Sequence, residues 1–195
     1  TIICTYIAFH RWVYNSSVKG NISTNDSDVA GLINYIGIYG AGGDVNIRNN
    51  SVKANLSTSL NDTFSGRAAG LIGFIDMGEG HLKIENSSYN GSIKTSTNGA
   101  GLVGVYDVYD NGKSNLSNSH SNADITVNAT GGGKIGGLIG DVSQYDQSEY
   151  ISINNSYAVG EYNSKDRVST DDTCIGCDTN LYIGGLIGVS NSEDG

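Results

Sequence analysis

The amino-acid sequence predicts an all-β fold: a right-handed parallel β-helix of about four to five coils, with three strands in each coil. Three observations lead to this prediction. One short phrase of glycines and apolar residues recurs along the chain, a second phrase built around an asparagine recurs with it, and the spacing from the first phrase to the second is nearly constant. Such a repeat indicates coils that bury their apolar positions by stacking on one another.

The first phrase predicts the first strand of each coil. It reads AGLIGFI in one copy and GGLIGVS in another, and stretches such as GLIGFID have the composition of a short strand. We expect its glycines to lie where a side chain would collide with a neighbouring strand or where the backbone turns sharply. The five copies are anchored at Gly31, Gly70, Gly101, Gly137 and Gly185.

The second phrase predicts the other two strands and the corner between them. It has an apolar residue, a spacer and an asparagine, and the segments HLKIENSS and NGSIKTS are examples of its two strands. We expect the asparagines to form a ladder at one corner, with side-chain amides hydrogen-bonded along the stack. These ladder residues are Asn15, Asn49, Asn86, Asn118 and Asn155.

The spacings predict how the chain is organised. From each anchor glycine to the following asparagine there are 16 to 18 residues, whereas from each asparagine to the next glycine there are 15 to 30. A solenoid keeps its stacked strands in register while one corner can extrude loops. We therefore expect residues 1–195 to be a single solenoid segment of a longer chain, with an insertion loop at about residues 163–180.

The two cysteines of that loop, Cys174 and Cys177 in the stretch CIGC, predict a local disulfide. A redox CxxC is expected beside a strand-helix unit, and a structural zinc site needs about four ligands. Redox use, zinc use and free thiols are the alternatives.

Charge and composition exclude some classes of partner. The chain has 20 acidic and 11 basic residues, a net charge of -9, which disfavours nucleic acids and anionic membranes. The apolar opening TIICTYIAF is much shorter than the roughly 20 residues of a membrane-spanning helix, so we expect no direct membrane insertion.

The stretches AGLIG and IENSSYNGSI resemble the GLUG motif, a repeat found in large secreted or surface-exposed proteins that include adhesin-like chains. The resemblance extends from about Ile2 to Gly188. The first copy departs from the motif, with TIICTYI in place of GLIG, and the second has Asn34 where the others have glycine. The resemblance implies a β-solenoid stalk or adhesive surface, with no family-wide active site.

A search for catalytic chemistry yields one alternative. HExxH, GxSxG and phosphate-binding glycine loops are missing from the sequence, so we expect no catalytic residue, metal or cofactor. Equivalent repeat positions do pair Asp76 with Asp107 and Asp110 with Asp146, as a carbohydrate-active β-helix enzyme would require. A solvated acidic face and weak divalent-cation binding are the other interpretations of these carboxylates.

Two further sets of residues are candidates for contact with partners or glycans. Tyr39, Tyr109 and Tyr145 share one repeat position, where stacked aromatic rings could bind a sugar or a protein, or could simply pack across strands. N-glycosylation is expected, if the source is eukaryotic, at sequons outside the ladder column: Asn21, Asn55, Asn61, Asn90 and Asn128.

The function that these features predict is non-enzymatic. We expect an extracellular or cell-surface protein that serves as a stalk, filament subunit or adhesin repeat region. Its partners would be copies of itself, neighbouring repeats of the same chain, glycans or host and cell-surface proteins. The alternative is a carbohydrate-active β-helix enzyme or a glycan-binding module.

Overall fold

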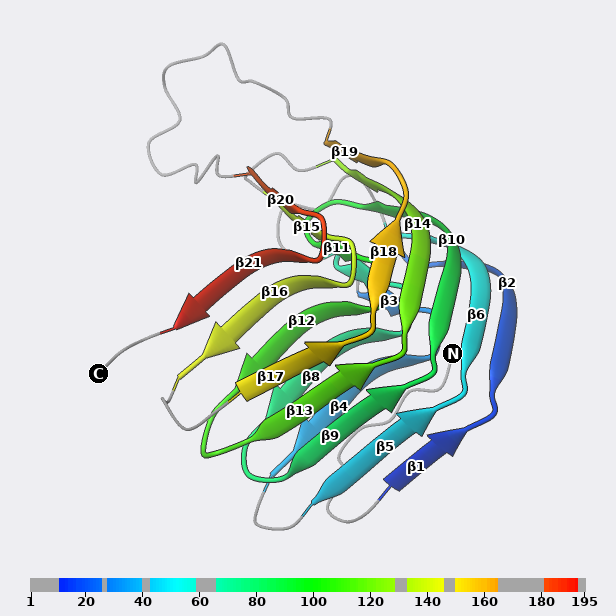
Figure 1. The fold of residues 1–195 in the computed structure, drawn as a ribbon. Helices are drawn as coiled ribbons and strands as arrows, with labels where there is room; N and C mark the ends of the chain where they lie inside the picture. The colour runs from blue at the N-terminus through cyan, green and yellow to red at the C-terminus, as the bar shows by residue number, and fades with distance from the viewer. Residues whose placement is uncertain are drawn as a thin grey trace, which may run out of the picture.

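The computed structural model describes residues 11–25, 28–39, 43–58, 66–128, 133–145, 150–164 and 181–192. Every regular element in these ranges is a β-strand, and the strands stack in parallel as a right-handed solenoid of about four coils (Figure 1). The predicted fold class is therefore confirmed. Within the described residues there is no helix of the length and apolarity that crossing a bilayer requires.

Each complete coil has one short strand followed by three longer stretches of strand. The predicted segments GLIGFID, HLKIENSS and NGSIKTS correspond to the three longer strands of the second coil. The short strand before them was not predicted as a strand of its own. The first two coils contain β3 (Val29–Ala30), β4 (Ile33–Ile38), β5 (Asp44–Arg48), β6 (Ser51–Ser57), β7 (Ala68–Ala69), β8 (Ile72–Met77), β9 (His81–Glu85) and β10 (Ser88–Thr95).

The other coils repeat this order. They contain β11 (Gly99–Ala100), β12 (Val103–Val108), β13 (Lys113–Ser117), β14 (His120–Val127), β15 (Gly133–Gly136), β16 (Ile139–Gln144), β17 (Tyr150–Asn154), β18 (Tyr157–Val159) and β19 (Tyr162–Ser164). A partial coil lies at each end of the described stack: β1 (Arg11–Tyr14) with β2 (Ser17–Ser23), and β20 (Leu181–Gly184) with β21 (Ile187–Ser192).

Equivalent strands of successive coils pair in register and form four parallel sheets. We name each sheet after its member in the first complete coil. The β3 sheet contains β3, β7, β11, β15 and β20; the β4 sheet contains β4, β8, β12, β16 and β21; the β5 sheet contains β1, β5, β9, β13 and β17; and the β6 sheet contains β2, β6, β10, β14 and β18, with β19 also paired to β14.

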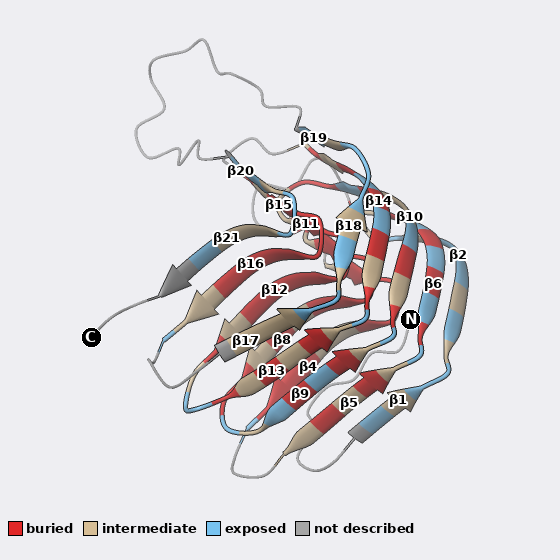
Figure 2. Cartoon of the chain, viewed as in Figure 1, coloured by how far each residue is buried: buried red, intermediate tan, exposed pale blue. Residues whose placement is uncertain are grey.

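The core is a continuous apolar column between these sheets. Leu32, Leu71, Leu102 and Leu138, the leucines of the first phrase, are all buried and stack one coil apart. Figure 2 shows buried residues alternating with exposed or half-buried ones along strands such as β6. Burial of these columns is the main source of stability in such a stack.

The anchor glycines are fixed by the coil that follows. A Cβ atom added to Gly70 would collide with the carbonyl oxygen of Gly101 in the next coil and with the ring of Tyr89 from the opposite sheet. The second glycine of the phrase has an equivalent constraint, because a Cβ on Gly104 would collide with the carbonyl oxygen of Gly73. Both glycine columns therefore lie where backbone approaches backbone, as predicted.

The five ladder asparagines lie at one corner, but the reason differs from the prediction. All five have a positive φ, between 46° and 56°, a conformation that asparagine tolerates better than most residues. Their side chains are exposed, and one amide pair bonds across coils, from Asn49 Nδ2 to Asn15 Oδ1 at 3.2 Å. Their repetition is thus explained first by the backbone turn.

The inward polar ladder belongs to the next position along the chain, which corrects the expected register by one residue. Its members are Ser16, Asn50, Ser87, Ser119 and Ser156. In Asn50, Ser87, Ser119 and Ser156 the side-chain oxygen accepts a hydrogen bond from the backbone N–H of the equivalent residue in the preceding coil, for example from Ser16 to Asn50 at 2.9 Å and from Ser87 to Ser119 at 3.1 Å. Because the residue after a left-handed asparagine points inward, this column and not the asparagines bonds within the stack.

Candidate functional site

The outer face of the β4 sheet carries aromatic and acidic side chains at positions that alternate with the core. Tyr39, Gly78, Tyr109 and Tyr145 follow the ends of β4, β8, β12 and β16 and form one column. Backbone hydrogen bonds connect its members to the preceding or following coil, from Tyr109 N to Met77 O at 2.8 Å and from Tyr145 N to Val108 O at 3.2 Å. The predicted common position of the three tyrosines is therefore found in space.

Three tyrosine hydroxyls converge on one carboxylate. The hydroxyls of Tyr35 and Tyr39 donate to Oδ2 of Asp76, the former at 2.9 Å, and the hydroxyl of Tyr109 donates to Oδ1 at 2.5 Å. The hydroxyl oxygens of Tyr35 and Tyr39 are 2.7 Å apart, so either hydroxyl can donate to the other in place of Asp76. We call Tyr35, Tyr39, Asp76, Tyr109 and Tyr145 the tyrosine surface.

Glycines make this convergence possible. A Cβ atom on Gly78 would lie 3.3 Å from the ring of Tyr109, and one on Gly37 would lie 2.8 Å from the ring of Tyr39. Without these side chains, the rings of Tyr39 and Tyr109 lean into the intervening coil, and their centroids are 6.5 Å apart. One carboxylate of the second coil thereby ties together tyrosines of the first and third coils.

The phenols of this cluster are held in their protonated form. Burial and the hydrogen bond to Asp76 raise the pKa of Tyr39 to about 12. The pKa values of Tyr35 and Tyr109 are raised further, because burial and the neighbouring Asp76 both disfavour a phenolate. At neutral pH the three hydroxyls are therefore donors, and Tyr39 and Tyr145 still expose 39 % and 48 % of their surface.

A second carboxylate lies directly beside the first. Asp107 is the register partner of Asp76 on the neighbouring strand. Its pKa is raised, mainly by burial and then by the charges of Asp141 and Asp76, against the opposing effects of a hydrogen bond from Ser143 and the charge of Arg67. Asp141 pairs with the ammonium of a nearby lysine. The expected pairing of Asp76 with Asp107 is thus present.

Aromatic packing continues from the tyrosine surface toward the β3 sheet. The rings of Tyr35 and Phe74 stack with centroids 5.6 Å apart. The guanidinium of Arg67 lies 4.7 Å above the Phe74 ring and is bound to Asp28 at 2.6 Å. This side of the surface is therefore fixed by stacking, cation–π and ionic contacts.

The predicted glycosylation sites have mixed locations. Asn21, Asn55 and Asn90 lie within β2, β6 and β10 and are exposed. Asn128 is half-buried, and Asn61 lies outside the described residues.

The ladder sequons correct a related expectation. Asn15, Asn49 and Asn86 are exposed, so stacking does not shield them from a glycan. Of the remaining sites, Cys174, Cys177, Asp146 and the insertion loop at residues 163–180 lie outside the described residues, apart from the last residues of β19.

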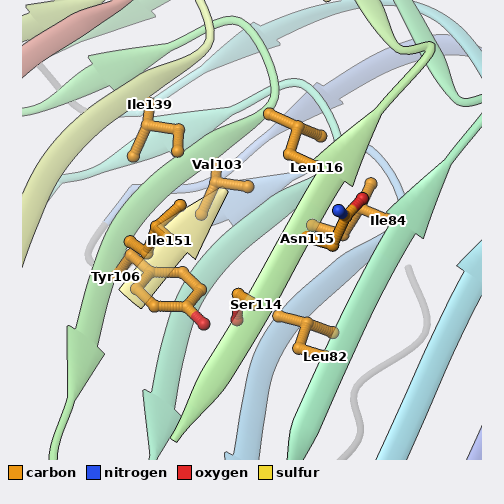
Figure 3. A pocket seen from close by; sticks show the side chains of 9 residues that line it. All are labelled: Leu82, Ile84, Val103, Tyr106, Ser114, Asn115, Leu116, Ile139 and Ile151. Atoms are coloured by element: carbon orange, nitrogen blue, oxygen red, sulfur yellow. The ribbon is translucent and has the colours of Figure 1, made fainter. Parts of the chain in front are cut away.

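One cavity in the described interior is too small for a ligand. A cavity of about 10 Å³ lies between the β4 and β5 sheets, and Figure 3 shows Leu82, Tyr106, Ser114 and their neighbours around it. This volume is about that of one water position. Within the described ranges, no three His, Cys, Asp or Glu residues are grouped as metal ligands.

Sequence reasoning found the tyrosine column but missed its centre. Tyr35 and the role of Asp76 as a shared acceptor were not predicted. The available signal was the alternation of β4 and β8, which places Tyr35 and Asp76 on the same outer face as the predicted tyrosines. The identity of the glycine at position 78 supplied a second signal, since it opens the space that the rings fill.

Comparisons with known proteins do not assign this surface. No protein-family model, no curated protein and no solved structure matches the chain. The class of protein defined by the fold is a parallel β-solenoid with an aromatic and acidic outer surface.

Proposed function

We propose that the chain is a non-enzymatic structural and adhesive segment of an extracellular or cell-surface protein. The observation that carries this proposal is the tyrosine surface, in which Asp76 holds Tyr35, Tyr39 and Tyr109 in fixed positions on a stacked scaffold. Aromatic side chains that are ordered before binding lose little conformational entropy when a partner arrives. Tyrosine also offers both apolar ring area and a polar hydroxyl to a partner.

Other features support this setting. The resemblance to GLUG repeats implies a surface-exposed or secreted protein, and the sequons Asn21, Asn55 and Asn90 are accessible in the folded chain. The two columns of glycine and the inward polar ladder serve coil stacking, which gives rigidity. Recognition is thereby left to outward residues, with glycans or cell-surface proteins as partners and no cofactor required.

An attachment assay tests the proposal. Beads coated with the chain are incubated with a panel of intact cells and extracellular-matrix preparations, and retention is measured under flow. We expect the chain to retain beads, and a variant with Tyr39→Ala and Tyr145→Ala to retain at least tenfold fewer. Tyr157→Ala, an exposed tyrosine of the β6 sheet, is the matched control and should have no effect. Equal retention by the double variant, or no retention by the chain, would refute the proposal.

A second candidate function follows from the carboxylate pair. Asp76 and Asp107 face each other across β8 and β12, and the raised pKa of Asp107 is a property of the acid in glycoside hydrolysis. The three phenols bound to Asp76 argue against its use as a nucleophile or base, because hydrogen bonds to both of its oxygens lower its basicity and nucleophilicity. Release of reducing ends from polysaccharides that is lost in Asp107→Asn would establish this alternative.

A further inference from the structure

The outer face of the β5 sheet carries a continuous row of side chains suited to a sugar chain. Trp12, Asn46, Lys83, Asn115 and Ser152 are register partners on five successive strands. They all point outward and are exposed or half-buried. Adjacent members are about 4.8 Å apart along the stack. We call these five residues the polar row.

The polar row runs along a depression. A hollow of about 330 Å³ is lined by Asp44, Asn46, His81 and Lys83, and a second, of about 280 Å³, shares His81 and Lys83 and extends to Asn115 and Ser152. Because the two hollows share two lining residues, they form one groove across the strands. Each volume is close to the lower end of ordinary ligand sites.

The edge of this groove has an exposed aromatic platform. Trp12 is the single tryptophan of the chain and has 68 % of its surface exposed. Its ring stacks on that of Tyr14, with centroids 5.8 Å apart and planes at 25°. An indole fixed in this way presents one face to solvent, where the apolar face of a sugar ring can pack.

The polar groups of the groove indicate the chemistry of the ligand. Amides and a hydroxyl can both donate to and accept from sugar hydroxyls. Within the described part of the chain, the side chains of Lys83 and His81 have no hydrogen-bond or ion-pair partner, so Lys83 offers its charge to a ligand. Glu85, by contrast, is bound to Arg48 at 2.8 Å and does not neutralise it.

The surrounding charge selects among anionic ligands. Asp44 lines one end of the groove, and Glu79 and Asp110 lie in the turns that lead into β9 and β13. A second cation, Lys113, lines the groove together with Lys83, so these three carboxylates stand against two lysines. A polymer with several sulfates on each ring would be repelled by these carboxylates, whereas one carboxylate per ring can pair with Lys83. We propose that the polar row binds a linear polysaccharide of uronic acids, lying across the strands of the β5 sheet.

This proposal rests on the binding role proposed above but uses a different face of the solenoid. The tyrosine surface belongs to the β4 sheet, and no residue is common to both. The two proposals can therefore fail separately: loss of alginate binding with intact bead retention refutes only the polar row, and loss of retention with intact alginate binding refutes only the tyrosine surface.

Alginate oligosaccharides, which are linear polyuronates, provide the test. Binding is measured by calorimetry and by the fluorescence of Trp12, which reports this groove alone because the chain has no other tryptophan. We expect saturable binding with a fluorescence change, and about a tenfold loss of affinity in Lys83→Gln and in Trp12→Ala. Lys94→Gln, an exposed lysine on β10 of the β6 sheet, is the matched control and should bind like the parent chain.

Two comparison ligands complete the design. Neutral cello-oligosaccharides and dextran sulfate should each bind at least tenfold more weakly than alginate. The proposal is overturned if alginate does not bind, if Lys83→Gln binds as well as the parent chain, or if either comparison ligand equals alginate. Competition by inorganic sulfate at the same molar concentration as alginate would also overturn it, since it would indicate a point-anion site.

Discussion

Replacement of Gly70 by alanine should destabilise the solenoid strongly, because the added methyl group has no space. It would meet the carbonyl oxygen of Gly101 and the ring of Tyr89. Neither can retreat easily: Gly70 and Gly101 belong to adjacent coils bonded in register, and the buried Tyr89 hydroxyl donates to Ala54 O at 2.8 Å and to Ser92 O at 3.0 Å. Overpacking of this kind costs about 1 to 3 kcal/mol, and a backbone clash places the cost near 3 kcal/mol.

A smaller opposing effect comes from the unfolded chain, since alanine has less conformational freedom than glycine there. That gain is about 0.4 to 1 kcal/mol, so the net loss in the free energy of unfolding should be about 2 to 3 kcal/mol. For a chain of this size, such a loss lowers Tm by roughly 4 to 12 °C. Thermal and urea unfolding followed by far-ultraviolet circular dichroism would measure it.

Gly185 provides the matched control, because it occupies the same repeat position in the last described coil. A Cβ atom on Gly185 would meet nothing within 4 Å. Gly185→Ala should therefore be neutral or stabilising by at most about 1 kcal/mol. If Gly70→Ala and Gly185→Ala have the same effect, the explanation of the glycine column by contact with the following coil is wrong.

The remaining predictions concern polar groups. Asp76→Asn keeps the shape of the side chain but removes the charge that strengthens its three hydrogen bonds, so the free energy of unfolding in urea should fall by roughly 1 to 3 kcal/mol. An unchanged unfolding midpoint would contradict the role of Asp76 in holding the three tyrosines together. Burial raises the pKa of Asp107, so its protonated form stabilises the fold at low pH and this stabilisation is lost as the pH rises and the carboxyl ionises. Asp107→Asn should therefore raise Tm at pH 7 but not near pH 3. A lower Tm of the variant at pH 7 would contradict this pH dependence. Stability from Tyr39 should be lost between about pH 10 and pH 12. Its ionisation is followed as the difference in absorbance at 295 nm between the parent chain and Tyr39→Phe, and complete ionisation of Tyr39 near pH 10 would exclude its hydrogen bond to Asp76. Asn50→Ala should lower the free energy of unfolding by about 1 to 3 kcal/mol, because the backbone N–H of Ser16 and the carbonyl of Val13 lose their hydrogen bonds to Asn50. Asn49→Gly should change the free energy of unfolding little, because Asn49 is exposed and glycine tolerates its left-handed conformation. Equal effects of the two substitutions would support the original prediction, in which the asparagines at position 49 and its equivalents hold the stack together.

The stacking of the coils could be predicted because it depends on positions that repeat. Gly70 has equivalents in the other coils, and Gly31, Gly101 and Gly137 make the same contact with the coil that follows. The register of the corner was harder to predict, because both Asn49 and Asn50 are polar and both could have pointed inward. Only the left-handed turn at Asn49 decides between them, and a one-residue shift reverses the direction of every side chain.

The candidate site could be predicted only in part, for a related reason. The repeat position of Tyr39, Tyr109 and Tyr145 was visible in the sequence. Their connection through Asp76 was not, because it joins residues of three coils and depends on the missing side chain at Gly78. The short strands were also missed, since two residues such as those of β7 are too few to show a period.

Repetition and function occupy different positions in this solenoid. An inward residue contacts its equivalents above and below, so one exchange affects two neighbouring coils and the same residue type is kept from coil to coil. An outward residue is free of that constraint and can differ in every coil. Asp76 lies in register with Gly37 and Asp107, and Lys83 lies in register with Asn46 and Asn115. Both surfaces proposed to bind partners are therefore built from outward positions where the residue type changes between some coils, as from Tyr39 to Gly78 or from Asn46 to Lys83, on a scaffold whose inward positions are occupied by stacking. Substitutions at the outward positions should consequently change binding with little effect on unfolding unless, like Asp76, they also join coils.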